Sequence, residues 1–373
     1  MADWQAVREQ FPALSRWTYL DTATFGQLPV SASEAMQRHC RRRDELGCTD
    51  FLSWFDDADR IRAKCARLVH AGAEDVAFFQ NACSALAVFL GGVDWRPGDR
   101  IVTLANEFPN NLYHPALLAC REVELVETGW DGFFDALRKP ARAVLLSTVN
   151  YTTGLRPPME EVAEAARQAG ALLFVDGTQS AGALDFDASR VAPDVFAVDG
   201  YKWLLCPNGA GFAYIHPRFR RVVAPQVIGW RSHKGWRSVD HLHHGAPEFV
   251  EAAEKYEGGM LPFPALYGME ASLDLILGLG IEEIEQRVLG LAAALRRVLR
   301  EAGAELFEGP LASNVVAARF SGVDMSALAR RLRERRVVVS ARHGYLRVSA
   351  HFYNNSEDIE TFQRALRWAL AAG

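Results

Sequence analysis

The chain contains two similar stretches, Leu172-Leu173-Phe174-Val175-Asp176-Gly177-Thr178-Gln179 and Val195-Phe196-Ala197-Val198-Asp199-Gly200-Tyr201-Lys202-Trp203. Each begins with a short apolar run typical of a buried strand and ends in polar residues. The first strand delivers a carboxylate, Asp176, and the second leads to an amine, Lys202, among apolar and aromatic neighbours. A buried Asp and a buried Lys at two strand ends are costly to keep, which indicates a functional site.

Similar apolar runs recur along the chain at residues 76–79, 101–104, 143–146 and 212–215. Helical patterns lie between several of them, such as Met159–Ala169, with Pro158 suited to its first turn. Apolar strands that alternate with helices predict an α/β fold with a mostly parallel sheet covered on both faces. Ligands bind at the carboxyl ends of such strands, so Asp176 and Lys202 fall where chemistry is expected.

The pattern changes after residue 260. Long helical patterns are followed by short strands and further helices, at residues 265–279, 281–302, 313–320, 325–335, 337–340 and 356–370. These elements predict a smaller α+β unit. The length of 373 residues also suits two domains. We therefore expect a large domain over residues 18–260 and a small C-terminal domain over residues 261–373, with residues 1–17 packed against the small domain.

Composition excludes several classes of protein. The 41 Lys+Arg and 46 Asp+Glu residues give a formal net charge of −5, and 49% of residues are hydrophobic, as in ordinary soluble proteins. The sequence shows neither a signal-like start nor about 18 consecutive apolar residues. We therefore expect a cytoplasmic protein that binds neither nucleic acid nor membrane. The scattered cysteines and the loop Asp240–His244 lack metal-ligand spacing, so no metal is expected.

The pair of Asp176 and Lys202 matches what pyridoxal 5′-phosphate (PLP) requires. This cofactor needs a lysine amine for its imine and a carboxylate that keeps its ring nitrogen protonated. Apolar surroundings disfavour the charged form of a lysine, which promotes imine chemistry. For either residue alone, a salt bridge at a strand end is the simpler interpretation. The segment Gly177–Gly182 lacks the spacing of a hydrolase nucleophile elbow.

The chain resembles the class V aminotransferase family of fold type I PLP-dependent enzymes, which includes cysteine desulfurases, kynureninases and isopenicillin N epimerase-like proteins. The resemblance runs from Tyr19–Ala23 to Arg347–Asn355. It rests on Asp-x-x-Gln at 176–179, Gly-Tyr-Lys-Trp at 200–203 and Pro-x-Gly-x-Gly at 207–211. It implies the PLP-dependent transferase fold, PLP as cofactor, an amino-acid substrate and a homodimer with shared active sites.

The resemblance also implies roles for the residues around the ring. Lys202 is the Schiff-base lysine and proton carrier, and Asp176 pairs with the ring nitrogen. Gln179 hydrogen-bonds the phenolic oxygen of the ring, and Asn150 stands in for an Asn that many relatives place at Tyr151. Phe108 replaces the histidine of desulfurases, so it can stack on the ring but gives no acid–base help.

Further implied contacts concern the phosphate and the substrate. Ala82 and Cys83 begin a helix whose free amides suit a phosphate, although a simple helix cap is the alternative. Tyr201 is a further phosphate contact, whereas Asp199 would repel a dianion unless protonated or turned away. The remaining contacts are Gly259 and Met260 toward the neighbouring subunit's phosphate, Arg347 toward the substrate carboxylate, and Ala23 and Thr24 over the substrate. Arginine suits a carboxylate because its fork binds both oxygens.

The reaction is less constrained than the cofactor. We expect an enzyme that acts on an amino acid through an external aldimine, with a class V aminotransferase as the first choice. The alternatives are a β-elimination lyase of the C–S lyase or kynureninase-like type, an amino-acid epimerase, and a noncatalytic PLP-binding module. We do not expect a persulfide-forming cysteine desulfurase, because residues 337–346 contain no cysteine.

Overall fold

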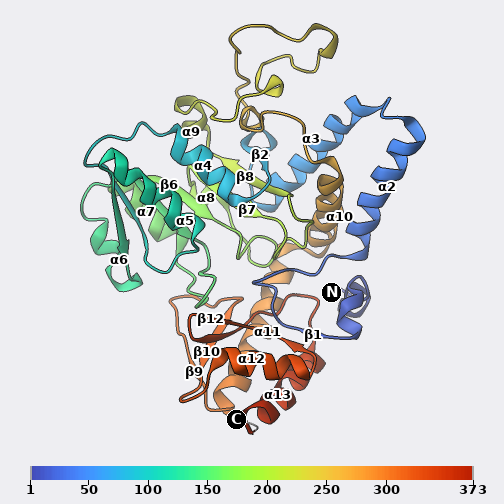
Figure 1. The fold of residues 1–373 in the computed structure, drawn as a ribbon, viewed down its shortest axis with the longest axis vertical. Coiled ribbons are helices and arrows are strands. Elements are labelled where there is room, and N and C mark those ends of the chain that lie inside the picture. The colour runs from blue at the N-terminus through green and yellow to red at the C-terminus, as the bar shows by residue number, and fades with distance from the viewer. Residues whose placement is uncertain (1, 372–373) are drawn as a thin grey trace.

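A seven-stranded sheet forms the centre of the larger of two units (Figure 1). The structure, a computed structural model, describes residues 2–371. In spatial order the strands are β2 (Val76–Phe79), β8 (Gly211–Ile215), β7 (Val195–Asp199), β6 (Leu172–Asp176), β5 (Ala143–Ser147), β3 (Arg100–Leu104) and β4 (Glu124–Thr128). Only β8 runs against the others. The predicted mostly parallel α/β fold is therefore confirmed.

Helices cover both faces of this sheet because alternate strand residues point to opposite sides. In β7, Val195 and Ala197 join one apolar cluster, whereas Phe196 and Val198 join the other. The first cluster includes residues of α4 (Ala82–Gly92) and α9 (Pro217–Val222). The second includes residues of α3 (Phe51–Leu68), α7 (Met159–Gln168) and α10 (Phe263–Leu279). α2 (Val30–Leu46) packs on α10 at the flank of the unit (Figure 1).

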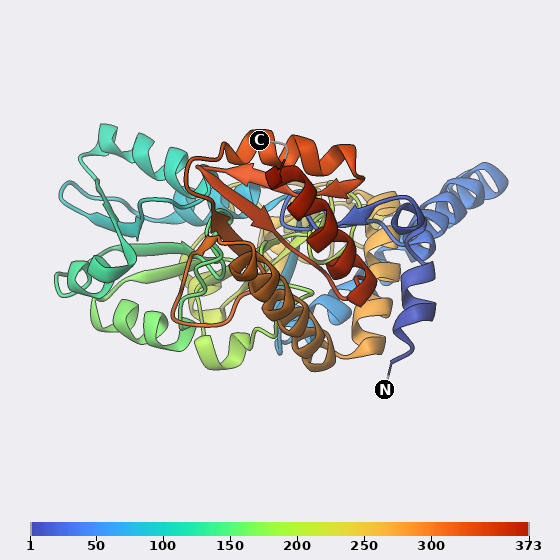
Figure 2. The ribbon, with the colours of Figure 1, turned by 90° about the horizontal axis from the view of Figure 1, so that it is seen from below.

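The smaller unit is built on an antiparallel sheet that lies below the large sheet in Figure 1. Its strands, in spatial order, are β12 (Ser340–Arg342), β13 (Tyr345–Val348), β10 (Val316–Arg319) and β9 (Glu305–Leu306). Figure 2 shows its helices, which are α11 (Ile281–Glu301), α12 (Met325–Glu334) and α13 (Ser356–Ala371). β1 (Thr18–Tyr19) pairs with β11 (Val337–Val338), so the segment ahead of α2 lies against this unit.

The carboxyl ends of the central strands face the small unit. The segment after β7 meets it where His351 Nε2 lies 2.8 Å from the Trp203 carbonyl oxygen. The segment after β6 meets it where the Asn314 side chain donates to the carbonyl oxygen of Gln179 at 2.8 Å. The parallel strands therefore deliver their polar ends to the junction of the two units.

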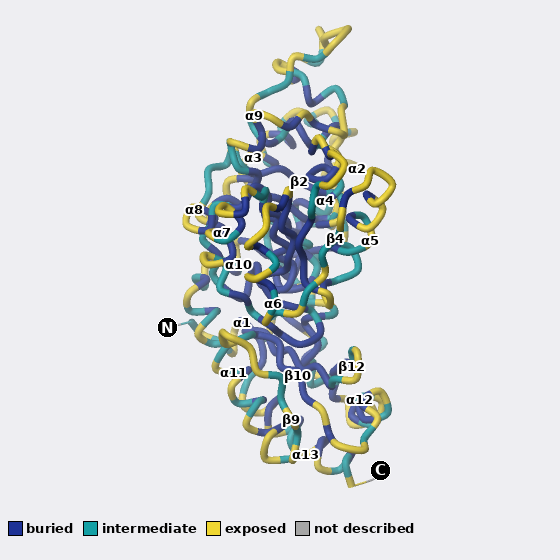
Figure 3. Tube along the Cα trace, turned by 90° about the vertical axis from the view of Figure 1, so that its left-hand side faces the viewer, coloured by how far each residue is buried: buried dark blue, intermediate teal, exposed yellow. Residues whose placement is uncertain are grey.

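Two other features complete the fold. Residues 223–262 form a long irregular excursion at the top of Figure 1, and much of it is exposed in Figure 3. Among residues 2–371, no single helix is long and apolar enough to cross a membrane, although the bent pair of α10 and α11 meets the length and composition criteria together.

Candidate functional site

Lys202 lies just after β7, and its side chain is only 6% exposed. Its amine is 5.3 Å from the centre of the Phe108 ring and 5.5 Å from that of Tyr201. No hydrogen bond or ion pair engages this amine within residues 2–371. A buried amine without a partner is unfavourable when charged. The position of this amine at a strand end therefore indicates a role in catalysis or ligand binding.

The surroundings of Lys202 favour its neutral form. Burial lowers the pKa of Lys202 to about 8, although Asp176 and Asp199 act in the opposite direction. The charges of Arg347 and Arg342 contribute to the lowering. The amine is therefore a usable nucleophile and base near neutral pH.

Asp176 ends β6, the strand next to β7. One of its carboxylate oxygens accepts a hydrogen bond from the Thr178 amide at 2.9 Å. The other oxygen accepts none from the part of the chain that the structure describes. Asp176 therefore keeps one oxygen available at the end of the strand next to that of Lys202, and its charge acts on the Lys202 amine.

A buried carboxylate supports the Phe108 ring. Glu107 accepts a hydrogen bond from the Ser147 amide at 2.7 Å and another from the Asn111 side chain at 3.0 Å. Burial raises the pKa of Glu107, which these hydrogen bonds oppose. Because Ser147 ends β5, Glu107 ties the Phe108 turn to the central sheet. No local pattern in the sequence signals this role, because Glu107 stands in a polar turn, Asn106-Glu107-Phe108-Pro109-Asn110.

The N-terminal loop closes over the Lys202 backbone. The Gly26 amide donates to the Tyr201 carbonyl oxygen at 2.9 Å. A Cβ atom at Gly26 would lie 1.9 Å from the Lys202 carbonyl oxygen, so only glycine fits there. In the same loop, the Ala23 carbonyl oxygen accepts from the Gln179 side chain at 3.0 Å. Gln179 also accepts from the Trp203 indole at 2.9 Å, so its acceptor oxygen is engaged by the protein.

Arg347 brings the small unit to the site. Its side chain is 1% exposed and lies on β13. It pairs with Asp21 at 3.1 Å and donates to the hydroxyl of Thr24 and the carbonyl oxygen of Tyr151. Arg347 and Thr24, each expected near the substrate, are therefore in contact with one another, and Asp21 joins them although it was not expected. A substrate carboxylate at Arg347 would share the guanidinium with Asp21.

A carboxylate binds one of the backbone amides at the start of α4. The Ala82 amide donates to Asp199 Oδ1 at 2.9 Å, whereas Cys83 is exposed. Burial and, to a smaller extent, the charge of Asp176 raise the pKa of Asp199 to about 6. The two residues expected to receive a phosphate thus lie beside an acid that can be neutral or ionised.

The contacts of Asn150 and Gly259 are with other parts of the chain, and the expected contact of Gly259 and Met260 with a neighbouring subunit stays a prediction. Asn150 is held in its own turn, where its oxygen accepts from the Thr152 and Thr153 amides at 3.0 Å. Gly259 belongs to the irregular excursion and accepts from the Arg231 guanidinium at 3.2 Å. Met260, which follows it, is 61% exposed. Within residues 2–371, no hydrogen bond joins Gly259 or Met260 to Lys202, Asp176 or Arg347.

Two residues of the small unit reach the site although the sequence did not indicate them. The Arg342 guanidinium lies 3.3 Å from the Thr24 hydroxyl. The His343 ring lies 2.7 Å from the Tyr151 hydroxyl. Tyr151 in turn meets the Phe108 ring edge-on, with centres 5.2 Å apart. No local pattern signals these contacts, because they depend on a hairpin about 190 residues away from Tyr151.

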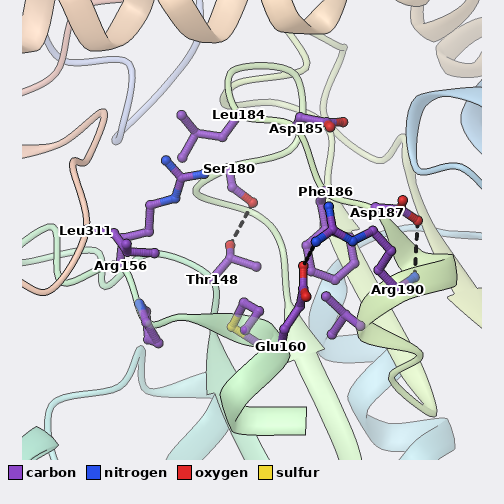
Figure 4. Close-up of a pocket in the computed structure, with 13 residues that line it drawn as sticks. Thr148, Arg156, Glu160, Ser180, Leu184, Asp185, Phe186, Asp187, Arg190 and Leu311 are labelled. Carbon is purple, nitrogen blue, oxygen red and sulfur yellow. Dashed lines mark hydrogen bonds and ion pairs between the residues drawn. The ribbon is translucent and has the colours of Figure 1, made fainter. Parts of the chain in front are cut away.

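Apart from the Lys202 site, a pocket lies beside the loop after β6 (Figure 4). It is walled by Thr148 and Ser180, whose hydroxyls are 2.7 Å apart. Its charged groups are paired, since Arg190 binds Glu160 at 2.6 Å and Arg156 binds Glu285 outside it at 2.9 Å. Because its arginines are already paired with carboxylates, it is a weaker candidate than the Lys202 site.

The side chains around Lys202 fit PLP. The site offers an unengaged amine at Lys202, an available oxygen of Asp176 and the face of Phe108. These are the groups that an aldehyde, a pyridine nitrogen and an aromatic ring require. The exposed start of α4 at Cys83 suits the phosphate.

Comparisons with known proteins agree with this fit. The family model described as Aminotransferase class-V matches residues 18–362. The chain is 25% identical to a probable cysteine desulfurase of Methanothermobacter thermautotrophicus, over 98% of each protein. The apo structure of a cysteine desulfurase from Thermococcus onnurineus NA1 is similar in fold, with a TM-score of 0.88, 22% identity and coverage of 100% of this chain and 99% of that one.

A second similar structure is the cystine C-S lyase C-DES in complex with its reaction product, cysteine persulfide. It has a TM-score of 0.85 and 24% identity, and the match covers 96% of this chain and 99% of that one.

These matches overturn one expectation. A persulfide-forming cysteine desulfurase was excluded because residues 337–346 contain no cysteine, but full-length relatives carry that name. The expectation rested on the absence of cysteine from one loop. Residues far apart in sequence meet at this site, so one loop does not decide the question. Cys83, for example, is exposed next to Ala82, whose amide binds Asp199.

Proposed function

Since the chain belongs to the class-V aminotransferase family of PLP-dependent enzymes, we propose that it breaks the carbon–sulfur bond of cysteine or of a related sulfur-containing amino acid. The observation that carries this proposal is the buried, unengaged Lys202 amine near the Phe108 ring, with its pKa lowered to about 8 by burial and influenced by the charges of Asp176 and Arg347. Two kinds of protein similar to this chain, cysteine desulfurases and a cystine C-S lyase, act on such substrates by name.

Bound PLP supplies an electron-withdrawing ring that stabilises negative charge at the substrate α-carbon. Lys202 would hold the cofactor through its amine, and Asp176 would keep the ring nitrogen protonated. Phe108 would support the face of the ring. Arg347 would hold the substrate carboxylate, which fixes the α-carbon near the Lys202 amine.

The residues of the chain then act on protons. With PLP bound, the Lys202 amine would take the α-proton of the substrate, and its lowered pKa of about 8 leaves about half of this amine neutral at that pH. In an elimination, the α-carbon pair forms the bond to the β-carbon, and the sulfur leaves with the electron pair of the broken bond. The sulfur would take up a proton and leave as a thiol, and water would convert the released three-carbon remainder into pyruvate and ammonia.

The test is to supply the cofactor-loaded protein with cysteine and with cystine, and to measure all products. Sulfide or persulfide with pyruvate and ammonia indicates elimination, whereas transferred sulfur with alanine indicates desulfuration. Either outcome supports the proposal because both break the same bond. Keto-acid formation with the sulfur retained would contradict it.

Transamination is the second candidate, because the family carries this activity in its name. The same Lys202 amine would return the proton to the cofactor side instead of allowing the sulfur to leave. The product would be the keto acid of the intact substrate.

The homodimer expected from the family resemblance is part of this proposal, and light scattering of the loaded protein tests it.

A further inference from the structure

A tight hairpin carries a second arginine to the site. β12 and β13 are joined by His343 and Gly344, which have positive φ angles of 47° and 79°. Two such residues in a row define the turn that best matches the twist of a two-stranded ribbon. The turn fixes the register, which pairs Arg342 with Tyr345 and Ser340 with Arg347.

This register places Arg342 and Arg347 on the same face of the hairpin. Side chains two apart along a strand share a face, as do directly paired residues across strands. Ser340, Arg342, Tyr345 and Arg347 therefore lie on one face. Leu346, on the other face, packs in the core of the small unit.

Both guanidinium groups converge on one hydroxyl. Arg347 donates to Thr24 Oγ1, and Arg342 Nη2 lies 3.3 Å from the same atom. Their electrostatic situations differ, however. Arg347 is paired with Asp21, whereas within residues 2–371 no carboxylate lies within 4.0 Å of Arg342. The other hydrogen bond of Arg342 goes to the carbonyl oxygen of its neighbour Ala341 at 2.9 Å.

The hairpin is also held against the large unit. His343 contacts the Tyr151 hydroxyl, and Tyr151 packs on Phe108. Arg342 is half-buried as a result. A half-buried cation beside another cation is unfavourable unless an anion joins it, and a bidentate guanidinium is well suited to a carboxylate.

We propose that Arg342 is a binding site for a second carboxylate, carried on the side chain of the amino-acid substrate. Arg347, whose guanidinium already contacts Asp21 and Thr24, would take the α-carboxylate. Arg342 would take a carboxylate that lies beyond the sulfur. The substrate class is thus an amino acid with an anionic side chain. This inference rests on the proposed function for its sulfur chemistry, but its binding test does not.

The test compares two probes that differ only in charge. S-(2-carboxyethyl)cysteine carries the second carboxylate, and S-(2-carbamoylethyl)cysteine carries a neutral amide of the same shape. Binding to the cofactor-loaded protein is followed through the visible absorption of PLP, and release of the free thiol is measured separately. The wild type is expected to bind the acid about tenfold more tightly than the amide, as charged hydrogen bonds allow.

The variant Arg342→Gln is expected to lose most of this preference, and Arg342→Lys is expected to keep part of it. Arg330→Gln, at an exposed position of α12, is the matched control and should retain the wild-type ratio. A wild-type ratio near one, or an unchanged ratio in Arg342→Gln, would overturn the inference. If Arg342→Gln bound both probes more weakly by the same factor, the inference would be overturned too, because Arg342 would then bind the α-carboxylate.

The two proposals fail in different ways. If the acid is preferred in binding but neither probe releases thiol, the second-carboxylate site stands, and carbon–sulfur cleavage is contradicted only if cysteine and cystine also release no sulfur. If thiol is released from both probes without preference, cleavage stands and the role of Arg342 is contradicted.

Discussion

The amine of Lys202 lies 5.3 Å from the centre of the Phe108 ring. The Phe108 ring can stack on the cofactor but cannot exchange a proton. Lys202 is left as the proton carrier on this side of the site.

Replacing Phe108 with alanine is expected to weaken PLP binding roughly threefold to tenfold, the range of one aromatic contact. Equilibrium titration of the cofactor-free protein, followed by visible absorption, measures this change. Phe108→Tyr keeps the ring and serves as the control. An affinity of Phe108→Ala equal to that of the wild type would remove Phe108 from the cofactor site.

The lowered pKa of Lys202 has a kinetic consequence. Only the neutral amine attacks the aldehyde of PLP, and burial places the pKa of Lys202 at about 8. The rate of PLP uptake by the cofactor-free protein is therefore expected to rise with pH up to about 8 and to level off above it. Stopped-flow absorption gives this profile. A rate that keeps rising toward pH 10.5 would mean that Lys202 titrates as an exposed lysine does.

Asp199 faces the start of α4 and binds the Ala82 amide at 2.9 Å. Its pKa is raised to about 6, mainly by burial, so Asp199 is ionised above this pH and neutral below it. An ionised Asp199 beside the phosphate repels it. Asp199→Ser is therefore expected to bind PLP several-fold more tightly at pH 8, with a smaller gain at pH 5. A gain that is independent of pH, or a loss at pH 8, would contradict this role.

Much of the architecture follows from the sequence because burial leaves a strong pattern. β2 has the predicted bounds, and β6 and β7 are each one residue longer than their predicted apolar runs. β4 was missed because it lies at the edge of the sheet, where Glu124 and Glu127 are exposed. Edge strands lack the continuous apolar run of central strands.

The site was predictable only where strands deliver its residues. Lys202 and Asp176 follow from the strand ends, and the family resemblance added Arg347 and Thr24. Arg342 was missed because its role depends on the turn at His343 and Gly344, which places it beside Thr24. Proximity across more than 300 residues leaves no periodic signal in the sequence.

Arg347→Ala removes the proposed clamp for the substrate carboxylate. The expected result is a rise of about tenfold or more in the apparent Kd for the amino acid, since hydrogen bonds between charged groups contribute about 1.5–3 kcal/mol. Arg347→Lys keeps the charge but loses the fork, and an intermediate value is expected for it. Because Arg347 also holds Asp21, the melting temperature of each variant must be compared with the wild type. An unchanged Kd in a folded variant would exclude Arg347 from substrate binding.

The rate at which the PLP-loaded protein releases sulfur from cysteine and cystine tests the proposed function most directly. The proposal predicts many turnovers per active site in the wild type and none above background in Lys202→Ala, which lacks the base that removes the α-proton. Arg330→Gln should match the wild type. If the loaded wild type released no sulfur, or if Lys202→Ala released it at the wild-type rate, the assignment of carbon–sulfur cleavage to this site would be contradicted.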